Sequence, residues 1–305
     1  MLRKVIRKRI IYCGHEQEMT KTAILLAAFF AVAISSRAVN LGVYDFAGGF
    51  ENANLNIENQ FISWCQYQPG TVYKAIEGAA SRRRELLLTL EPWSDCFFKS
   101  GLLNEVVNGK HDAVLTAVCT DIRRAALPLY VRWGHEMEQN FGRYPWSTKK
   151  PAAYIAAYRH VVLKMRSMLE GIPVKFIWSP AGNANAEAYF PGCDVVDAIG
   201  LSVYSYAQWD KWAYGSPQSF KQLMDAKYHV ASLCSREKPV IVCEMGAYSS
   251  SDPSYKARWV ADALSVAHAH YYPRLQALVW FNARDPAAWG FVGRPDFRVS
   301  PTIWR

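Results

Sequence analysis

The stretch LPLYVRWGHEMEQNFGRYPW, residues 127–146, joins a short apolar segment to a polar and aromatic one. Residues 129–131 predict a buried β-strand, because they are mainly apolar and include a β-branched side chain. His135 and Glu136 follow where that strand should end. A carboxylic acid there can protonate a glycosidic oxygen, and the indole of Trp146 can stack on a sugar ring. These features suggest a sugar site, although a salt-bridged surface glutamate would produce the same pattern.

Seven further segments with the same apolar character predict strands, and helical patterns alternate with them. The eight expected strands are residues 41–46, 61–65, 85–90, 129–133, 174–178, 198–204, 240–244 and 277–281. The clearest helical patterns cover residues 112–124, 151–169, 219–234 and 254–270. This alternation predicts a single-domain (β/α)8 barrel, a TIM barrel, over residues 39–305. A doubly wound open sheet is the alternative, but no glycine-rich phosphate turn follows the first strand.

Residues 1–38 form a leader that resembles a secretory signal. Lys21 precedes an apolar run at residues 23–34, and small residues follow it in the sequence SSRA. Met19 would be an ordinary start for such a signal. The apolar run is too short to span a bilayer comfortably. We therefore expect a secreted or periplasmic protein with no stable membrane anchor.

Charge and cysteine content exclude some classes of partner and metal site. The net charge is +9, of which +5 lies in residues 1–38. The basic run at residues 82–84 is interpreted as a solvated helix end, so we expect no nucleic-acid partner. Six of the seven cysteines follow the leader, and export would permit disulfides among them in pairings that sequence does not determine. Their spacing suggests no zinc site, and we expect a monomer.

The residues at the expected strand ends combine acids with aromatic rings. In a closed barrel the carboxyl ends of all strands meet at one rim, where active sites lie. The positions at these ends include Tyr44, Asp45, Glu91, Trp93, Arg132, His135, Glu136, Trp178, Tyr204, Tyr206, Glu244 and Trp280. Glycoside hydrolysis needs such a set, because it uses two carboxyl groups and flat apolar faces for the sugar.

Four segments carry a resemblance to a known family. In chain order RWGHEMEQNFGRYPW, FIWSPAGN, YFPGCDVVDAIGLSVY and VIVCEMGAY resemble glycoside hydrolase family 26, and the similarity covers nearly all of the chain after Val39. That family contains β-mannanases, mixed-linkage β-glucanases and some xylanases. The His-Glu pair at residues 135–136 is fairly specific to it. The Tyr-Pro-Trp at residues 144–146 is closer to the glucanase-type members.

The resemblance and the chemistry of the side chains together imply roles for most of the residues at the rim. Glu136 would be the acid/base and Glu244 the nucleophile. The supporting residues would be His135, Arg132 and Tyr204, which orient the nucleophile or keep it charged. The expected substrate-binding residues are Glu91, Trp93, Trp146, Trp178 and Trp280. Roles other than catalysis or substrate binding stay open for four of these residues. Arg132 could be purely structural, Trp93 and Trp178 could be core packing residues, and Glu91 could act only through other residues.

These residues and the family resemblance together predict a retaining endo-β-glycosidase. It would hydrolyse a β-linked polysaccharide, a β-1,3-1,4-glucan or a β-1,4-mannan, by double displacement and without metal or cofactor. Retaining chemistry would place the carboxyl groups of Glu136 and Glu244 about 5–5.5 Å apart. Two alternatives keep a polysaccharide or oligosaccharide partner: a non-catalytic carbohydrate-binding barrel, and a transglycosylase in exopolysaccharide processing.

Overall fold

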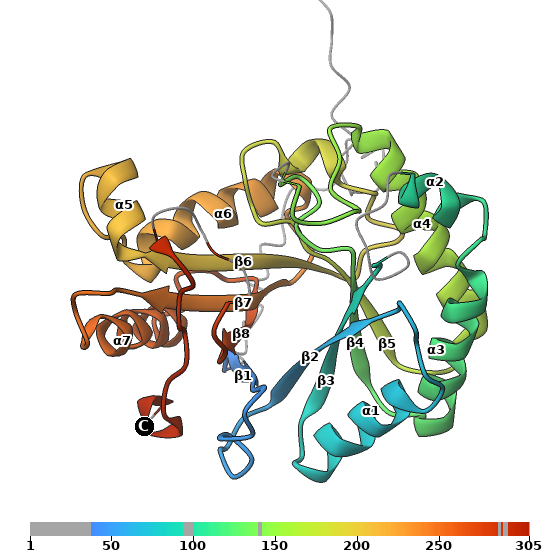
Figure 1. The fold of residues 1–305 in the computed structure, drawn as a ribbon, viewed down its shortest axis with the longest axis horizontal. Helices are drawn as coiled ribbons and strands as arrows, with labels where there is room; N and C mark the ends of the chain where they lie inside the picture. The colour runs from blue at the N-terminus through green and yellow to red at the C-terminus, as the bar shows by residue number, and fades with distance from the viewer. Residues whose placement is uncertain (1–37, 94–100, 140–141, 286–287, 289–291, 305) are drawn as a thin grey trace, which may run out of the picture.

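The computed structural model describes residues 38–304 apart from 94–100, 140–141, 286–287 and 289–291. Within that part of the chain, eight parallel strands pair in chain order, and β1 pairs with β8 to close the barrel (Figure 1). The strands are β1 (Asn40–Tyr44), β2 (Ile57–Ser63), β3 (Glu85–Glu91), β4 (Leu129–Trp133), β5 (Val174–Trp178), β6 (Ala198–Tyr206), β7 (Val240–Tyr248) and β8 (Leu275–Phe281). The expected (β/α)8 barrel is confirmed.

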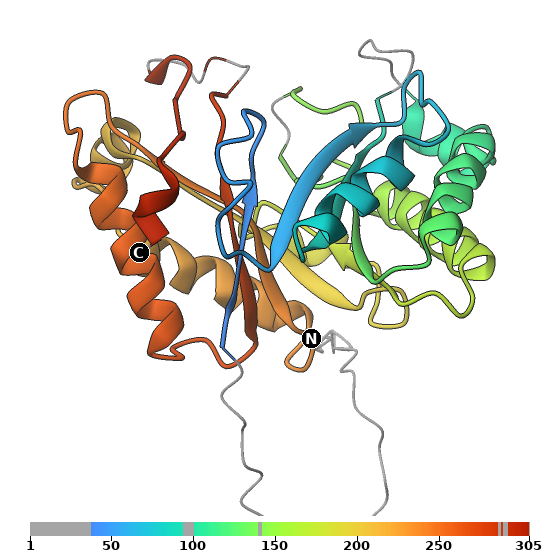
Figure 2. The same cartoon turned by 90° about the horizontal axis from the view of Figure 1, so that it is seen from below.

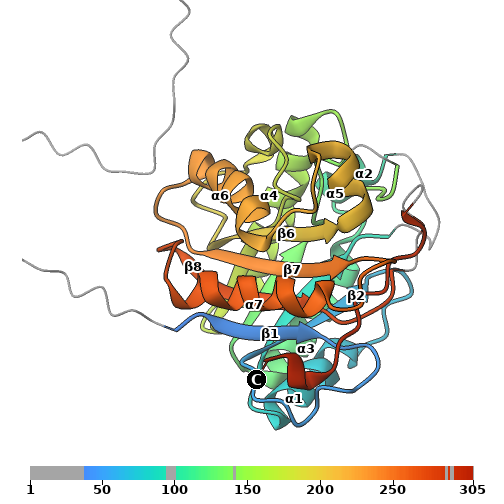
Figure 3. The same ribbon diagram turned by 90° about the vertical axis from the view of Figure 1, so that its left-hand side faces the viewer.

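Helices surround the strands (Figure 2). They are α1 (Thr71–Ser81), α2 (Leu102–Val107), α3 (Asp112–Ala125), α4 (Pro151–Met168), α5 (Ala207–Tyr214), α6 (Phe220–Cys234) and α7 (Tyr255–His268), with short 3-10 turns at Ala186–Tyr189 and Pro301–Trp304. The four predicted helices correspond to α3, α4, α6 and α7. Figure 3 shows β6 and β7 pointing the same way, with α5 directly after the arrowhead of β6.

Strand β2 begins four residues before the predicted start, because its first half is polar. Glu58 and Asn59 lie at 8% and 1% exposure, and both have partners. Glu58 accepts hydrogen bonds from Arg82 at 2.7 and 2.9 Å and from Arg84 at 3.2 Å. Arg84 is buried, so the interpretation of residues 82–84 as a solvated helix end is wrong for this side chain.

The structure bears only in part on the predictions about the leader, the cysteines and the membrane. Residues 1–37 of the leader lie outside the described residues. Cys119, Cys234 and Cys243 are free thiols, whereas Cys65 and Cys193 are disulfide-bonded. The described helices include none with the length and apolarity that crossing a membrane would need.

Candidate active site

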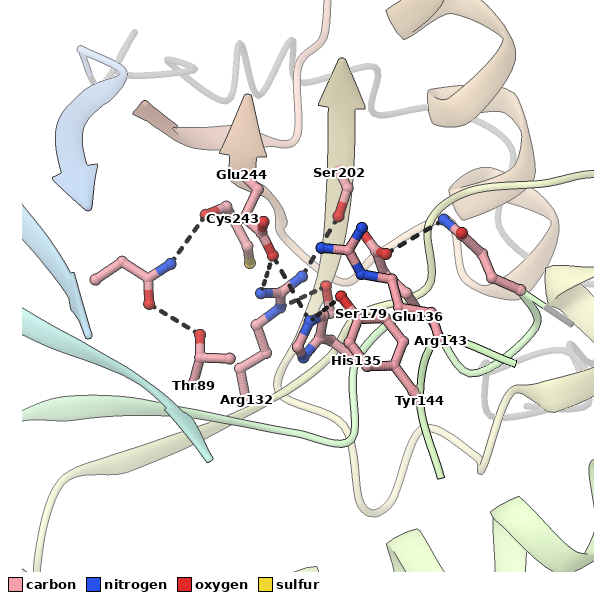
Figure 4. A network of polar contacts seen from close by, with 12 residues as sticks. Thr89, Arg132, His135, Glu136, Arg143, Tyr144, Ser179, Ser202, Cys243 and Glu244 are labelled. Carbon is pink, nitrogen blue, oxygen red and sulfur yellow. Dashed lines mark hydrogen bonds and ion pairs between the residues drawn. The ribbon is translucent and has the colours of Figure 1, made fainter. Parts of the chain in front are cut away.

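A buried arginine of β4 fixes the carboxylate of Glu244 on β7 (Figure 4). Arg132 Nη1 donates to Glu244 Oε1 at 2.5 Å, while Nε donates to Ser179 Oγ at 2.9 Å and Nη2 to Ser202 Oγ at 3.4 Å. The Tyr204 hydroxyl donates to the other carboxylate oxygen of Glu244 at 2.7 Å. Each oxygen of Glu244 therefore accepts a charge-assisted hydrogen bond, which holds the carboxylate in one orientation.

Glu136 reaches the same site through an unusual backbone turn after β4. Gly134 and Glu136 have φ of +55° and +54°, in the left-handed region that costs energy for a non-glycine residue. The Glu136 amide donates to the Ser179 carbonyl at 2.8 Å, and this bond helps to hold the turn. Gln139 Nε2 donates to Glu136 Oε2 at 3.2 Å. The turn thus places a second carboxyl group near enough to Glu244 for the charge of Glu244 to act on it (Figure 4).

The surroundings of Glu136 favour its protonated form. Burial raises the pKa of Glu136 to about 7, and the negative charge of Glu244 acts in the same direction. A hydrogen bond from Ser202 and the charges of Arg132 and Arg143 oppose that rise in pKa. The two carboxyl groups of the site thus have different environments. Arg132 hydrogen-bonds Glu244, whereas burial raises the pKa of Glu136. Such a difference lets one acid donate a proton while its neighbour stays charged.

His135 supports this pocket without a hydrogen bond to Glu244. Its Nε2 lies 3.2 Å from the Tyr144 hydroxyl and 4.0 Å from Glu244 Oε1. Burial, followed by the charges of Arg132 and Arg143, lowers the pKa of His135 well below its usual range. The ring is therefore neutral at neutral pH. The structure places it beside the expected nucleophile, with Tyr144 as its hydrogen-bond partner.

A third carboxyl group, Glu91, follows at the end of β3. Burial raises the pKa of Glu91 to about 7, and the charge of Glu244 contributes. A hydrogen bond from Trp93 and the charges of Arg132 and Arg143 lower it. Glu91 is thus electrostatically coupled to the same site, as its place at a strand end predicts. Its contact with a substrate stays a prediction.

Three of the predicted sugar-stacking indoles are packed inside the protein. Trp146, Trp178 and Trp280 are each 0% exposed. Trp146 stacks on Tyr144 with ring centroids 4.6 Å apart, and Trp280 Nε1 donates to the Phe297 carbonyl at 3.0 Å. A sugar stacks on an accessible ring face. The prediction that these three rings are sugar platforms is therefore wrong for this structure, and Trp146 instead backs the ring that hydrogen-bonds His135.

Trp93 occupies an intermediate position. Its side chain is half-buried and meets Trp146 edge-on, with ring centroids 5.2 Å apart. It also donates a hydrogen bond to Glu91. Trp93 therefore has both a packing contact and a link to an acid of the site, and its role in substrate binding stays a prediction.

The structure brings together aromatic residues to which the sequence reasoning gave no role. Tyr44 stacks on Phe281 at 5.0 Å and meets Phe61 edge-on at 4.8 Å, and all three are half-buried. Phe61 lies 5.9 Å from the His135 ring. The sequence signal that could have identified these rings is the two-residue period of a strand, because successive strand residues point to opposite faces. Phe281 joins the rings of the site, whereas the ring of Trp280 before it lies 6.2 Å from the ring of Trp259 on α7.

Arg143 is the other missed residue. It lies in the loop after β4, 3.4 Å from Asp285 Oδ1, and its guanidinium carbon is 5.4 Å from the centre of the Tyr144 ring. Its charge acts on Glu91, Glu136 and His135 alike. No group of three or more metal-ligating side chains occurs among the described residues.

Comparison with solved structures gives the same fold. GH26C from a Muricauda species matches with a TM-score of 0.63 and 13% identity, covering 81% of this chain and 80% of its own. The catalytic domain of a Bacillus species GH26 endo-β-1,4-mannanase matches with a TM-score of 0.62 and 14% identity, covering 81% and 78%. At these identities the likeness supports the barrel alone.

Sequence comparison identifies the family. The chain is 27% identical over 258 residues to Endoglucanase H of Acetivibrio thermocellus, which covers 81% of this chain and 27% of the relative. It is 23% identical over 155 residues to the β-1,3-xylanase TXYA of a Vibrio species, covering 46% of this chain and 33% of the relative. The chain thus spans about a quarter to a third of the length of these relatives. A model of glycosyl hydrolase family 26 matches residues 99–272, more than half of the chain, and the chain therefore belongs to that family.

Proposed function

We propose that this protein is a retaining endo-β-glycosidase that hydrolyses a β-linked polysaccharide. The observation that carries the proposal is the pair of buried carboxyl groups, one in the turn after β4 and one within β7. Arg132 and Tyr204 hydrogen-bond Glu244, whereas burial raises the pKa of Glu136 to about 7. A nucleophile must be charged and a general acid must carry a proton, so the two environments suit these two roles.

In the first step Glu244 attacks the anomeric carbon and the bond to the leaving oxygen breaks. Glu136 transfers its proton to that oxygen, so the leaving sugar departs as an alcohol. In the second step water gives a proton to Glu136 and its oxygen attacks the same carbon, which releases Glu244 as a carboxylate. The two inversions restore the original β-configuration. Arg132 and Tyr204 support this cycle by holding Glu244 in one orientation before and after the attack.

The proposed substrate is a β-1,3-1,4-glucan or a β-1,4-mannan. The relative matched over most of the chain is named an endoglucanase, and the Tyr-Pro-Trp at residues 144–146 resembles the glucanase-type members. Solved structures that share the fold include endo-β-1,4-mannanases. We place the glucan first, because the endoglucanase match is the stronger sequence likeness.

The test is incubation of the purified protein with a panel of mixed-linkage glucan, mannan and β-1,3-xylan. We expect reducing ends to increase on one polymer, mixed-size oligosaccharides to appear early, and the first products to be β-anomers by proton NMR. A Glu244→Gln variant should be inactive on the whole panel. Release of α-anomers would refute the retaining mechanism, and a wild-type protein that binds a polymer but cleaves none would indicate a non-catalytic barrel.

Transglycosylation is the alternative in which a sugar replaces water in the second step. Because both reactions use the same two glutamates, products longer than the starting oligosaccharide would identify it. The proposal includes export, to a secreted or periplasmic location, through the signal-like segment at residues 23–34.

A further inference from the structure

Three exposed aromatic side chains gather on α5, the helix after β6 at the open end of the barrel (Figure 3). Trp209, Trp212 and Tyr214 are 38%, 73% and 56% exposed. The ring centroids of Trp209 and Trp212 lie 6.3 Å apart, and Tyr214 meets Trp209 edge-on at 5.6 Å. We call these residues the α5 patch. Large apolar side chains that are exposed together on one element mark a binding surface, whereas scattered ones need no explanation.

A buried, hydrogen-bonded aspartate fixes the inner side of α5, so that the α5 patch faces outward. Asp210 is 1% exposed and accepts hydrogen bonds from the Ser205 hydroxyl and from the Gln218 amide at 3.3 Å. Ser205 Oγ also lies 2.6 Å from the Tyr255 hydroxyl of α7. On an ideal helix Asp210 projects about 160° away from Trp212. Asp210 therefore fixes α5 from its inner side and leaves the indole of Trp212 on the outer side.

The α5 patch continues from the candidate active site along the chain. Tyr204, which hydrogen-bonds Glu244, stacks with Tyr206 at a centroid distance of 6.2 Å, and α5 begins at the next residue. Tyr204 and Trp209 are five residues apart, so their Cα atoms are separated by at most about 18 Å. A polymer held at Glu244 can therefore reach the patch, and flat rings suit the apolar faces of sugars.

We infer that the α5 patch is a second contact surface for the β-linked polysaccharide, separate from the site that contains the two glutamates. The inference rests on the proposed function and specifies where a long substrate is held. Only a long chain can occupy both surfaces at once, so the patch raises the affinity for polymer and leaves short substrates unaffected.

The test compares a Trp209→Ala/Trp212→Ala double variant with the wild type. Retention in native gels that contain soluble mixed-linkage glucan or galactomannan measures polymer binding, and kcat/KM is measured on the same polymers and on a dinitrophenyl disaccharide. We expect polymer binding and polymer kcat/KM to fall about fivefold or more, with the disaccharide kcat/KM unchanged. The matched control is Tyr271→Ala. Tyr271 is an aromatic residue with 59% exposure, and it precedes β8 at the opposite end of the barrel.

The outcomes separate this inference from the proposed function. A wild type that is retained but cleaves nothing, with retention lost in the double variant, would support the patch and refute the proposed reaction. An active wild type whose double variant keeps full retention and polymer kcat/KM would overturn the inference alone. A wild type neither retained nor active on any polymer would overturn both. Loss of a wild-type dimer in the double variant, with retention unchanged, would assign the patch to a second copy of the chain and also overturn the inference.

Discussion

At the scale of single residues, the two glutamates differ in what their loss should do. Glu136→Ala removes proton donation, which a dinitrophenyl leaving group does not need. This variant should still form the glycosyl-enzyme, show a burst, and be rescued by azide to give the β-glycosyl azide. Glu244→Ala should give the α-azide, because azide then attacks from the vacated face. General acid/base help is typically worth about 10²–10⁴-fold, so the Glu136→Ala loss should be largest on polymer.

Product analysis by NMR checks that assignment. If both variants gave the same azide anomer, or if Glu136→Ala lost equal activity on activated and natural substrates, the roles of the two residues would have to be withdrawn.

The pH dependence of activity is a second prediction for Glu136. Because its pKa is raised to about 7, the protonated fraction falls as the pH increases through that value. The kcat/KM of the wild type on natural polymer should therefore decline above about pH 7. On the same polymer, the residual kcat/KM of Glu136→Ala should lack this decline.

Glu91 supplies the control, because its pKa is also raised to about 7. A Glu91→Gln variant should keep the decline above neutral pH. If the decline disappeared in Glu91→Gln and persisted in Glu136→Ala, the titrating acid would be Glu91.

At the scale of elements, the strands were the most predictable feature. The bounds of β4 and β5 match the prediction, because central barrel strands are short apolar runs. The start of β2 was missed because its polar residues have buried partners that lie far away in the sequence. Helix α5 was missed because its outer face is aromatic, which breaks the usual amphipathic pattern.

The site itself was predictable in part. The strand-end rule located Arg132, Tyr204 and the glutamates from the expected strand ends, although β6 continues two residues beyond Tyr204 and β7 four residues beyond Glu244. It could not tell which ring of the Trp280-Phe281 pair faces the site, since that depends on register. The close packing around Gly200 could not be predicted from the sequence either. A side chain at Gly200 would place its Cβ 2.5 Å from Ser179 Oγ, the atom that hydrogen-bonds Arg132.

Hydrogen bonds between the loops after β4 and β5 give a prediction for Glu138. Its Oε1 accepts hydrogen bonds from the amides of Gly182 and Asn183 at 2.9 and 3.3 Å, and its side chain is buried. Glu138→Ala would leave these amides without their acceptor, which costs about 1–3 kcal/mol each when the donor is buried. The same loop carries the Ser179 carbonyl that holds Glu136, so kcat/KM should also fall.

Urea unfolding and kcat/KM on polymer measure both effects. Glu138→Gln keeps an acceptor oxygen and is the matched control, with a smaller loss expected in each. Equal losses in the two variants would mean that these hydrogen bonds do not stabilise the loop.

At the scale of the whole molecule, export predicts where the mature chain begins. If residues 23–34 act as a cleaved signal, protein recovered from outside the cytoplasm should start close to Val39. N-terminal sequencing or intact mass measures this directly. The control is a variant with Leu25→Arg and Leu26→Arg, which should stay in the cytoplasm uncleaved. Exported protein that retains Met1 would contradict the signal-peptide interpretation.

The acidic site should also make the stability of the whole fold depend on pH. The ordinary pKa of Glu136 is 4.5 and its folded value is about 7, so between these values the folded state binds more protons than the unfolded one. Its contribution to the free energy of unfolding is complete below about pH 4.5 and is lost as the pH rises through 7. At about 1.4 kcal/mol per pKa unit, the loss reaches about 3 kcal/mol at pH 8. A Glu136→Gln variant has no such titration. The difference between its urea midpoint and that of the wild type should therefore shift in favour of the variant from pH 4 to pH 8. The exposed Glu170→Gln is the control and should show no such change between the two pH values. If Glu136→Gln and the wild type kept the same difference in unfolding free energy at both values, the carboxyl group would not be held protonated by the fold, and its assignment as the acid would lose its electrostatic basis.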